Sequence, residues 1–318
     1  MQPCAATFGV EFPRGDGSVA NVLEVEHLAK NYGSFVAVED VSFSVEEGEI
    51  FGILGPNGAG KTTTVECLQG LRRMDGGEAR VLGLDPRHHS EQLRRQIGCQ
   101  LQESALPDKL KVWEALSFFA SLRAEGARWE QVMEDWGLSA KRSAAFGSLS
   151  GGQQQRLFIA LAVLNAPKLV FLDEMTTGLD PTARREVWEL VRKIRDGGTT
   201  VVLVTHFMDE AETLCDRLAV IDDKRVVALG TPDGLIEEYD SGAEVTFSTD
   251  AADLEFLRSA EGVSQIERDG RRVTVHGDGA LLAHVAASLV EHGLAPADLR
   301  VKRTSLEDVF LRITQGRT

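Results

Sequence analysis

The sequence predicts an α/β protein whose main domain is a parallel sheet with helices on both faces, followed by a smaller α+β domain. Three predicted strands, at residues 50–54, 168–172 and 200–204, carry the unbroken apolar runs 50–54, 169–172 and 201–204 and are separated by segments with helical periodicity. Continuous apolar strands of this kind are typical of parallel sheets buried on both faces. The chain has 318 residues, which is enough for two domains with separate cores.

Composition excludes several classes of protein. The formal net charge of −15 disfavours a nucleic-acid surface, which needs clustered Lys and Arg. No apolar run approaches the roughly 18 to 20 residues of a membrane span. Four scattered cysteines without a CxxC pattern indicate reduced thiols and a cytoplasmic compartment. Residues 1–20 lack the pattern of a signal peptide, and we expect a disordered extension, either solvated or docked on a partner through Phe8 and Phe12.

The segment before the first continuous strand predicts a small antiparallel sheet. Residues 22–27 alternate like an edge strand, and residues 35–37 and 41–45 supply two further strands. Tyr32 lies in the turn between the first two. Its residue type favours a surface turn tyrosine, and the alternative is a ring that stacks on a purine.

A glycine-rich loop follows the strand at residues 50–54 and precedes a predicted helix. Its sequence, GPNGAGKT at residues 55–62, fits the pattern GxxxxGK[ST]. Glycines let the backbone curl, so that its N–H groups and the helix N-terminus point at an anion. We therefore predict a nucleotide phosphate site, with Lys61 between the β- and γ-phosphates and the Thr62 hydroxyl on Mg²⁺. The predicted nucleotide contacts in this loop are Gly55, Pro56, Asn57, Gly58, Ala59, Gly60, Lys61, Thr62 and Thr63.

A helical insert comes next. Residues 112–122 and 129–136 have amphipathic spacing, and their tryptophans belong either to the core or to a partner-facing surface. The sequence LSGGQ at residues 149–153 opens a further helix, whose free N–H groups form a second candidate anion site. Read alone, this serine and its glycines are a helix N-cap with a flexible turn.

Two strand ends carry candidate catalytic groups. Asp173 and Glu174 follow the strand at residues 168–172, where one carboxylate would join the Mg²⁺ shell and the other would position or deprotonate water. His206 follows the strand at residues 200–204, and it either donates a hydrogen bond to a γ-phosphate or is an ordinary loop histidine.

The order of these motifs resembles the nucleotide-binding subunits of ABC transporters over about residues 22–235. The matching segments are Walker A (GPNGAGKT, 55–62), the Q-loop glutamine Gln102, the signature LSGGQ (149–153), Walker B (LVFLDE, 169–174), the D-loop GLD (178–180) and the H-loop Thr205-His206. Met175 departs from the pattern, because relatives commonly have proline there.

The resemblance implies the ligands and their residues. ATP would stack on Tyr32, Mg²⁺ would be held by Thr62, Gln102 and Asp173, and the catalytic residues would be Glu174, His206 and Gln102. It also implies a head-to-tail homodimer in which the ATP of one chain meets the signature of the other, at Ser150, Gly151, Gly152 and Gln153.

The chain changes character after residue 230. Strands at 244–248, 263–268, 272–276 and 299–303 alternate with helices at 252–260 and 280–292 in the order βαββαβ, and a helix at 305–313 closes the chain. This order predicts a ferredoxin-like domain. The ending at residues 304–311 resembles the C-terminal extension of ABC-2-type exporters similar to daunorubicin-resistance ATPases.

These expectations combine into one hypothesis. A disordered extension (1–20) precedes a P-loop nucleotide-binding domain (21–236, with a helical subdomain at about 100–165) and an α+β accessory domain (243–318). The protein would hydrolyse ATP on the inner face of the cell membrane to power export of a drug, lipid or other amphiphile through a separate permease, without a nucleic-acid partner. The alternatives are a non-transport ABC ATPase acting on nucleic acid or ribosomes, and an importer subunit.

Overall fold

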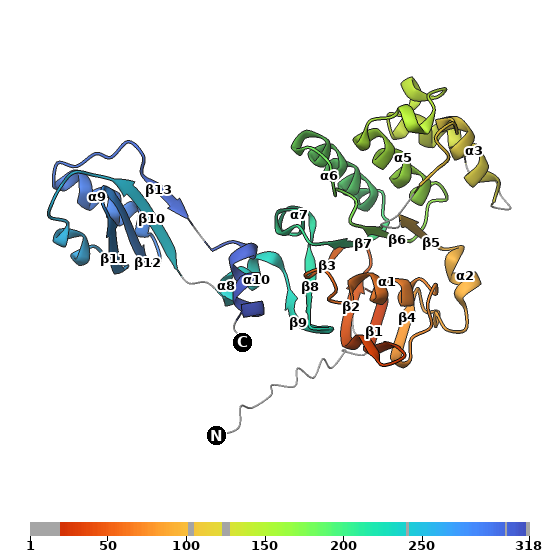
Figure 1. The fold of residues 1–318 in the computed structure, drawn as a ribbon, viewed down its shortest axis with the longest axis horizontal. Coiled ribbons are helices and arrows are strands. Elements are labelled where there is room, and N and C mark those ends of the chain that lie inside the picture. The colour runs from red at the N-terminus through yellow and green to blue at the C-terminus, as the bar shows by residue number, and fades with distance from the viewer. Residues whose placement is uncertain (1–19, 101–104, 123–127, 240–241, 303, 316–318) are drawn as a thin grey trace. The chain divides into compact units, whose positions relative to one another are not determined.

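The computed structural model describes residues 20–100, 105–122, 128–239, 242–302 and 304–315. The expectations for Gln102 and for the N-terminal extension up to residue 19 lie outside this range. The chain forms two compact units that divide between Pro232 and Asp233, and each is described by itself (Figure 1). No helix in the described part of the chain combines the length and apolar character needed to span a membrane.

The first unit is built on a mixed sheet. Within the described residues nine strands pair in the order β4-β1-β2-β9-β8-β3-β7-β6-β5. Strands β3, β5, β6, β7 and β8 run parallel, as predicted, while β9 returns antiparallel to β8 and the β1, β2 and β4 segment is antiparallel. The bounds are β1 (Asn21–Tyr32), β2 (Phe35–Glu46), β3 (Ile50–Leu54), β4 (Gly76–Val81), β5 (Ile97–Gln100), β6 (Leu169–Asp173), β7 (Thr200–Thr205), β8 (Arg217–Asp222) and β9 (Arg225–Gly230).

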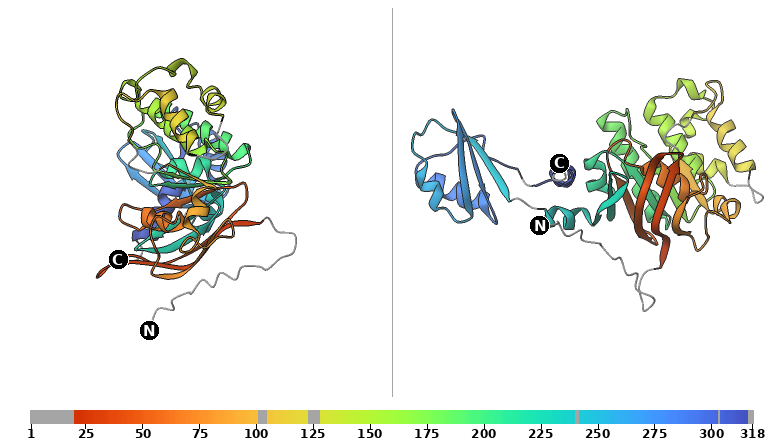
Figure 2. Two further views of the ribbon diagram at one scale, coloured as in Figure 1. Left: turned by 90° about the vertical axis from the view of Figure 1, so that its right-hand side faces the viewer. Right: turned by 60° about the horizontal axis from the view of Figure 1, so that its bottom comes forward.

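Two expectations for the antiparallel segment are wrong. The predicted edge strand at residues 22–27 lies between β4 and β2, and the two predicted strands at 35–37 and 41–45 are one continuous strand, β2 (Figure 2). Leu23, Val25 and Leu28 of β1 are fully buried on one face. Alternation along a strand reports which face is buried, whereas its hydrogen-bonded neighbours are set by segments distant in sequence.

Helices cover both faces of the parallel strands, as the sequence predicts. The helix α1 shares a core with β2 and β3, through Val65 and Leu68 against Phe43 and Phe51. The opposite face meets α6 and α7. The helices of this unit are α1 (Lys61–Leu68), α2 (Ser90–Arg94), α3 (Val112–Ser121), α4 (Trp129–Asp135), α5 (Gly151–Val163), α6 (Pro181–Asp196) and α7 (Met208–Leu214), with 3-10 turns at Ser139–Lys141 and Phe146–Ser148.

The second unit has its own core. Its described strands pair antiparallel in the order β11-β12-β10-β13, and α9 packs on one face through Leu281, Val285 and Leu289. The bounds are α8 (Pro232–Glu238), β10 (Ala243–Ser248), β11 (Val263–Asp269), β12 (Arg272–Gly277), α9 (Leu281–Glu291), β13 (Arg300–Lys302) and α10 (Leu306–Gln315).

One helix of this unit differs from expectation. The predicted α-helix at residues 252–260 is a 3-10 helix, η3 (Glu255–Ser259). The buried leucines of this segment, Leu254 and Leu257, are three residues apart, and residues at that spacing eclipse one another in a 3-10 helix. The tighter helix therefore places both leucines over the sheet.

Candidate functional site

The glycine-rich loop curls between β3 and α1 in a space that only glycine fits. A Cβ atom on Gly55 would lie 2.1 Å from the carbonyl oxygen of Ile221, and one on Gly60 would lie 2.6 Å from that of Ala37. Gly60 also has φ +103°, in the left-handed region that side chains disfavour. The two neighbouring strands thus hold the loop in a curled shape that can receive an anion at the start of α1.

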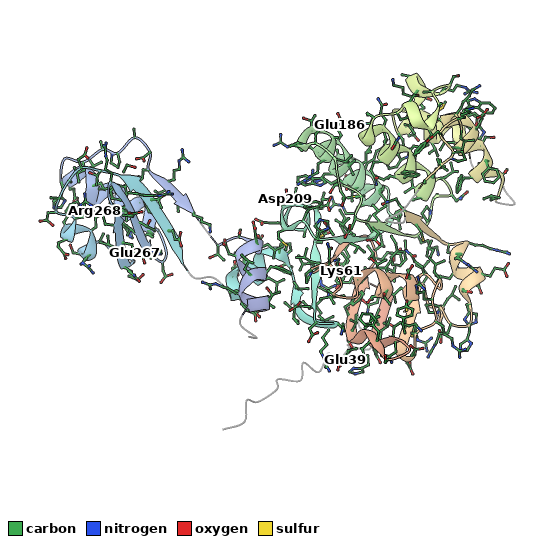
Figure 3. All side chains as sticks on the ribbon, viewed as in Figure 1. Glu39, Lys61, Glu186, Asp209, Glu267 and Arg268 are labelled. Atoms are coloured by element: carbon green, nitrogen blue, oxygen red, sulfur yellow. The ribbon has the colours of Figure 1, made fainter. Side chains whose placement is uncertain are left out.

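Lys61 is already directed into this loop. Its side chain is buried, and its Nζ donates to the carbonyl oxygens of Gly55 (2.8 Å) and Pro56 (3.0 Å). Figure 3 labels this residue beside α1. Burial lowers the pKa of Lys61, and the nearby Glu174 and Asp173 carboxylates oppose that shift. The loop, the cation and the acidic pair therefore form one site.

Asp173 ends β6 and is buried, 3% exposed. Burial, and next the Glu174 carboxylate, raise its pKa to about 6, against a hydrogen bond from Thr62 and the charge of Lys61. Its Oδ1 has no hydrogen-bond partner among the residues that the structure describes. The structure thus places the Thr62 side chain near Asp173. A buried carboxylate oxygen without a donor, beside a hydroxyl group, suits a hard divalent cation such as Mg²⁺.

Glu174 and His206 meet because their strands are neighbours. Strands β6 and β7 pair in parallel, and the Glu174 N–H donates to the Val204 carbonyl oxygen at 2.9 Å. The His206 Nδ1 lies 3.2 Å from Glu174 Oε1. Glu174 has φ +46°, a left-handed conformation that costs a non-glycine residue about 1 kcal/mol or more. Its carboxylate is thereby directed to the same side of the sheet as the imidazole.

The turn after Glu174 is well defined although Met175 replaces the proline of the ABC pattern. Met175 is buried, and the Thr177 N–H donates to the Glu174 carbonyl oxygen at 3.3 Å. Asp180 then caps α6 by accepting from two backbone N–H groups, and Pro181 occupies the first turn. Capping and burial thus fix both ends of this turn.

The signature segment lies at the start of α5. Ser150 and Gln153 form a reciprocal capping box, as the N-cap interpretation predicts. A Cβ atom on Gly151 would lie 3.4 Å from the Leu179 side chain, and one on Gly152 would lie 3.1 Å from that of Ala183. Ser150 and Gly151 are exposed. The signature therefore packs on α6, whereas the phosphate loop packs on β2 and β8.

Tyr32 lies at the end of β1 and is 41% exposed. The Lys30 Nζ and the Arg72 guanidinium carbon lie 5.4 Å and 5.6 Å from its ring centroid. The ring is accessible and is held by cation–π contacts, which suits stacking on a base.

Sequence reasoning missed Glu210 of α7. Its side chain is fully buried and accepts hydrogen bonds from Thr176 and Trp188. One signal was present, since Glu210 stands four residues before the buried Leu214 and thus in phase with the apolar face of the helix.

Comparison with known proteins agrees with this geometry. Residues 38–177 match the family described as ABC transporter. The chain is 37% identical over 308 residues to the daunorubicin resistance ATP-binding protein DrrA2 of Streptomyces coeruleorubidus, covering 93% of this chain and 96% of that protein. It is also 37% identical over 317 residues to the Nod factor export ATP-binding protein I of Ralstonia nicotianae, covering 96% and 97%.

A solved structure described as the ATP binding subunit of an ABC transporter is similar to the chain, with a TM-score of 0.62 and 30% identity. The matched region covers 69% of this chain and 93% of the chain in that structure. The chain belongs to the ABC transporter ATP-binding proteins, a family of ATP hydrolases.

Proposed function

We infer that this chain is the ATP-hydrolysing subunit of an exporter and powers transport through a separate membrane permease. The observation that carries this inference is the length of the similarity. The two relatives, named for daunorubicin resistance and Nod factor export, match 93% and 96% of this chain, which includes the second unit. A shared ATP-binding unit alone would be equally consistent with import. The substrate class we propose is a drug, lipid or other amphiphile.

The residues of the site have distinct proposed roles. The loop at residues 55–63 and Lys61 bind the phosphates of ATP, and Tyr32 stacks on adenine. Thr62 and Asp173 hold Mg²⁺, which when bound neutralises charge on the β- and γ-phosphates. Glu174 orients or deprotonates the attacking water, and His206 holds the Glu174 carboxylate and donates to the γ-phosphate. Gln102 remains a predicted ligand.

We further propose that two copies join head to tail. The Ser150 turn is exposed and its helix packs on α6, whereas the phosphate loop packs on β2 and β8, so we expect the N–H groups of Gly151 and Gly152 to be available to an ATP from outside the chain. A second copy would place its ATP against Ser150, Gly151, Gly152 and Gln153. This dimer would sit on the inner face of the membrane through the permease.

The domain assignment follows from the same reasoning. We propose that residues 21–236 form the nucleotide-binding domain, with a helical subdomain at about 100–165, and that residues 243–318 form a ferredoxin-like accessory domain. The antiparallel order β11-β12-β10-β13 supports the second assignment, because the first strand of the unit, β10, lies between β12 and β13, and only β11 and β12 pair as a hairpin.

Efflux from cells tests the function. Cells without this chain should lose energy-dependent efflux of a compound from a panel of amphiphilic drugs and fluorescent lipids, and the wild-type chain should restore it. Glu174→Gln should fail to restore it at equal expression. Loss of uptake in place of efflux would overturn the direction of transport, and unchanged efflux of every compound would overturn the proposed substrate class.

Mixed subunits test the dimer. Ser150→Arg adds bulk and charge to the signature but leaves the phosphate loop intact, so monomeric ATP binding should survive while hydrolysis fails. A head-to-tail dimer of Ser150→Arg with Lys61→Ala has one site damaged twice and one site intact. Partial ATPase activity in the mixture supports the trans site. If the heterodimer forms but holds ATP at neither site and is inactive, the trans role of Ser150 is wrong. Inactivity with ATP held at one site would instead show that turnover needs two intact sites.

A further inference from the structure

A buried carboxyl group joins the two segments that carry the proposed catalytic residues. Glu210 of α7 is fully buried, and its Oε1 accepts from the Thr176 hydroxyl at 2.9 Å and from the Trp188 indole N–H at 3.0 Å. Figure 3 labels the preceding residue, Asp209, near the start of this helix. Burial raises the pKa of Glu210, and interactions with Thr205, Thr176 and Trp188 oppose that shift. Two donors, one from the turn after Glu174 and one from α6, therefore converge on one oxygen of this side chain, and its Oε2 has no hydrogen-bond partner among the described residues.

Two threonines that interact with Glu210 stand close in sequence to the two proposed catalytic residues, Glu174 and His206. Thr176 lies two residues after Glu174, and Thr205 lies immediately before His206. Both threonines are fully buried. The Thr205 hydroxyl also accepts from the Phe207 N–H at 3.0 Å, which fixes the backbone on the other side of His206. Glu210 thus contacts the turn after Glu174, and its own helix, α7, begins directly after His206 and Phe207.

Trp188 links Glu210 to a second helix through its indole N–H. Trp188 belongs to α6, the helix that begins after the turn containing Glu174. Arg184 of the same helix pairs with Asp209 at 2.9 Å and lies over the Phe207 ring, with its guanidinium carbon 4.6 Å from the ring centroid. Helices α6 and α7 are therefore cross-linked on both sides of Glu210, and its carboxyl group is held in a fixed position.

Burial of a carboxyl group is unfavourable unless donors offset the lost hydration, and an apolar side chain of similar volume would often stabilise a core as well. Glu174 is also held in a left-handed conformation, which persists only when its surroundings fix it. A buried acceptor in α7 that holds Thr176 and Trp188 together meets that requirement.

We propose that Glu210 is a positioning residue for ATP hydrolysis, which holds the turn of Glu174 against α7, the helix that begins directly after His206 and Phe207. This proposal rests on the roles given above to Glu174 and His206. The hydrogen bonds that Glu210 accepts from Thr176 and Trp188 involve no residue of the phosphate loop, so we expect this side chain to act on the geometry of hydrolysis and to leave ATP binding to the loop. Its loss should lower kcat while the Kd for ATP stays the same.

Three variants test this. Glu210→Leu removes the acceptor at similar volume, and it should lower kcat about 10- to 100-fold, the range expected when catalytic groups are displaced by about 1 Å. Glu210→Gln keeps an oxygen for Thr176 and Trp188 and should retain most of the activity. Glu212→Leu changes an exposed glutamate on the same helix and should behave like the wild type. The measurements are kcat and KM for Mg-ATP, and Kd and stoichiometry from equilibrium titration with ATP.

The outcomes separate positioning from a structural role. A loss of binding stoichiometry with unchanged kcat per bound ATP would show that Glu210 serves folding alone and would overturn the proposal. If Glu210→Leu does not fold, the nearly isosteric Thr176→Val variant decides by the same comparison of kcat with Kd, and an unchanged kcat overturns the proposal. If Glu174→Gln is inactive and folded Glu210→Leu is fully active, only this proposal fails. Turnover by Glu174→Gln would instead contradict the proposed role of Glu174.

Discussion

Asp173 in the ATP-binding unit and Asp308 in the second unit both lie beside a hydroxyl group, yet their pKa values shift in opposite directions. Burial raises the pKa of Asp173 to about 6. The Ser305 hydroxyl and backbone N–H, at 2.7 Å and 3.0 Å from its Oδ2, lower the pKa of Asp308 to about 2. The first carboxylate has a buried oxygen without a donor among the described residues, whereas the second caps α10.

The difference shows what each carboxylate contributes. Asp308 stabilises its helix terminus in its ionised form, as a capping residue does. Asp173 is held ready for a ligand at a cost to the folded protein, together with the buried Lys61 and the left-handed Glu174. Groups that are costly to the fold gather at functional sites because the ligand or the reaction makes use of them.

Among the variants that test this comparison between the two units, Glu174→Gln should have the largest effect, and that effect is on kcat. The carboxamide keeps the size of the side chain and loses the charge that polarises water, so kcat should fall about 100-fold or more. ATP binding should remain, and the protein should accumulate as an ATP-bound dimer, visible by size-exclusion chromatography with ATP. Lys61→Ala is the matched comparison, because it should lose ATP binding itself. Near-normal turnover of Glu174→Gln would remove Glu174 as the residue that activates water.

An intermediate effect, on the stability of the folded protein in the absence of Mg²⁺ and nucleotide, is expected from Asp173→Asn. A folded-state pKa raised from 3.8 to about 6 means that ionisation destabilises the folded protein as pH rises through that interval. At about 1.4 kcal/mol per pKa unit, the penalty reaches about 3 kcal/mol above pH 6. Asp173→Asn should therefore unfold at a higher denaturant concentration at pH 7.5, and the gain should vanish toward pH 4.

Tryptophan fluorescence suits this measurement, because the four tryptophans of the chain, at residues 113, 129, 136 and 188, all lie in the first unit. The same variant should lose Mg-ATP hydrolysis. Equal stability of the two proteins across pH 4 to 8 would show that burial of Asp173 carries no such penalty.

The smallest effect is expected from Asp308→Ala. Loss of a helix cap costs about 1 kcal/mol, so amide hydrogen exchange should quicken along α10 while ATP binding stays the same. The lowered pKa means that this stabilisation is present above about pH 4 and is lost as pH falls toward 2. Glu307→Ala changes an exposed residue of the same helix turn and serves as the control. Equal exchange in the two variants would contradict the capping role.

Much of the candidate site could be read from the sequence, because its chemistry is encoded locally. The glycines of the phosphate loop, the acidic pair after β6 and the capping box of Ser150 each lie within a few residues, and short-range backbone geometry decides their shape. The approach of Asp173 to Thr62 follows from the same logic, because Thr62 comes after β3, Asp173 ends β6, and the carboxyl ends of parallel strands in one sheet share one edge even with β7 between them.

Other features were decided by the tertiary structure. The neighbours of β1 depend on β4, which lies about fifty residues away, and alternation along β1 carries no information on pairing. The 3-10 turn at Glu255–Ser259 follows from the sheet that Leu254 and Leu257 must cover. Glu210 stands in phase with the apolar face of α7, but its burial depends on the Thr176 hydroxyl and the Trp188 indole N–H, which belong to other segments of the chain. Burial and strand pairing join segments that are distant along the chain, and local sequence does not specify that partnership.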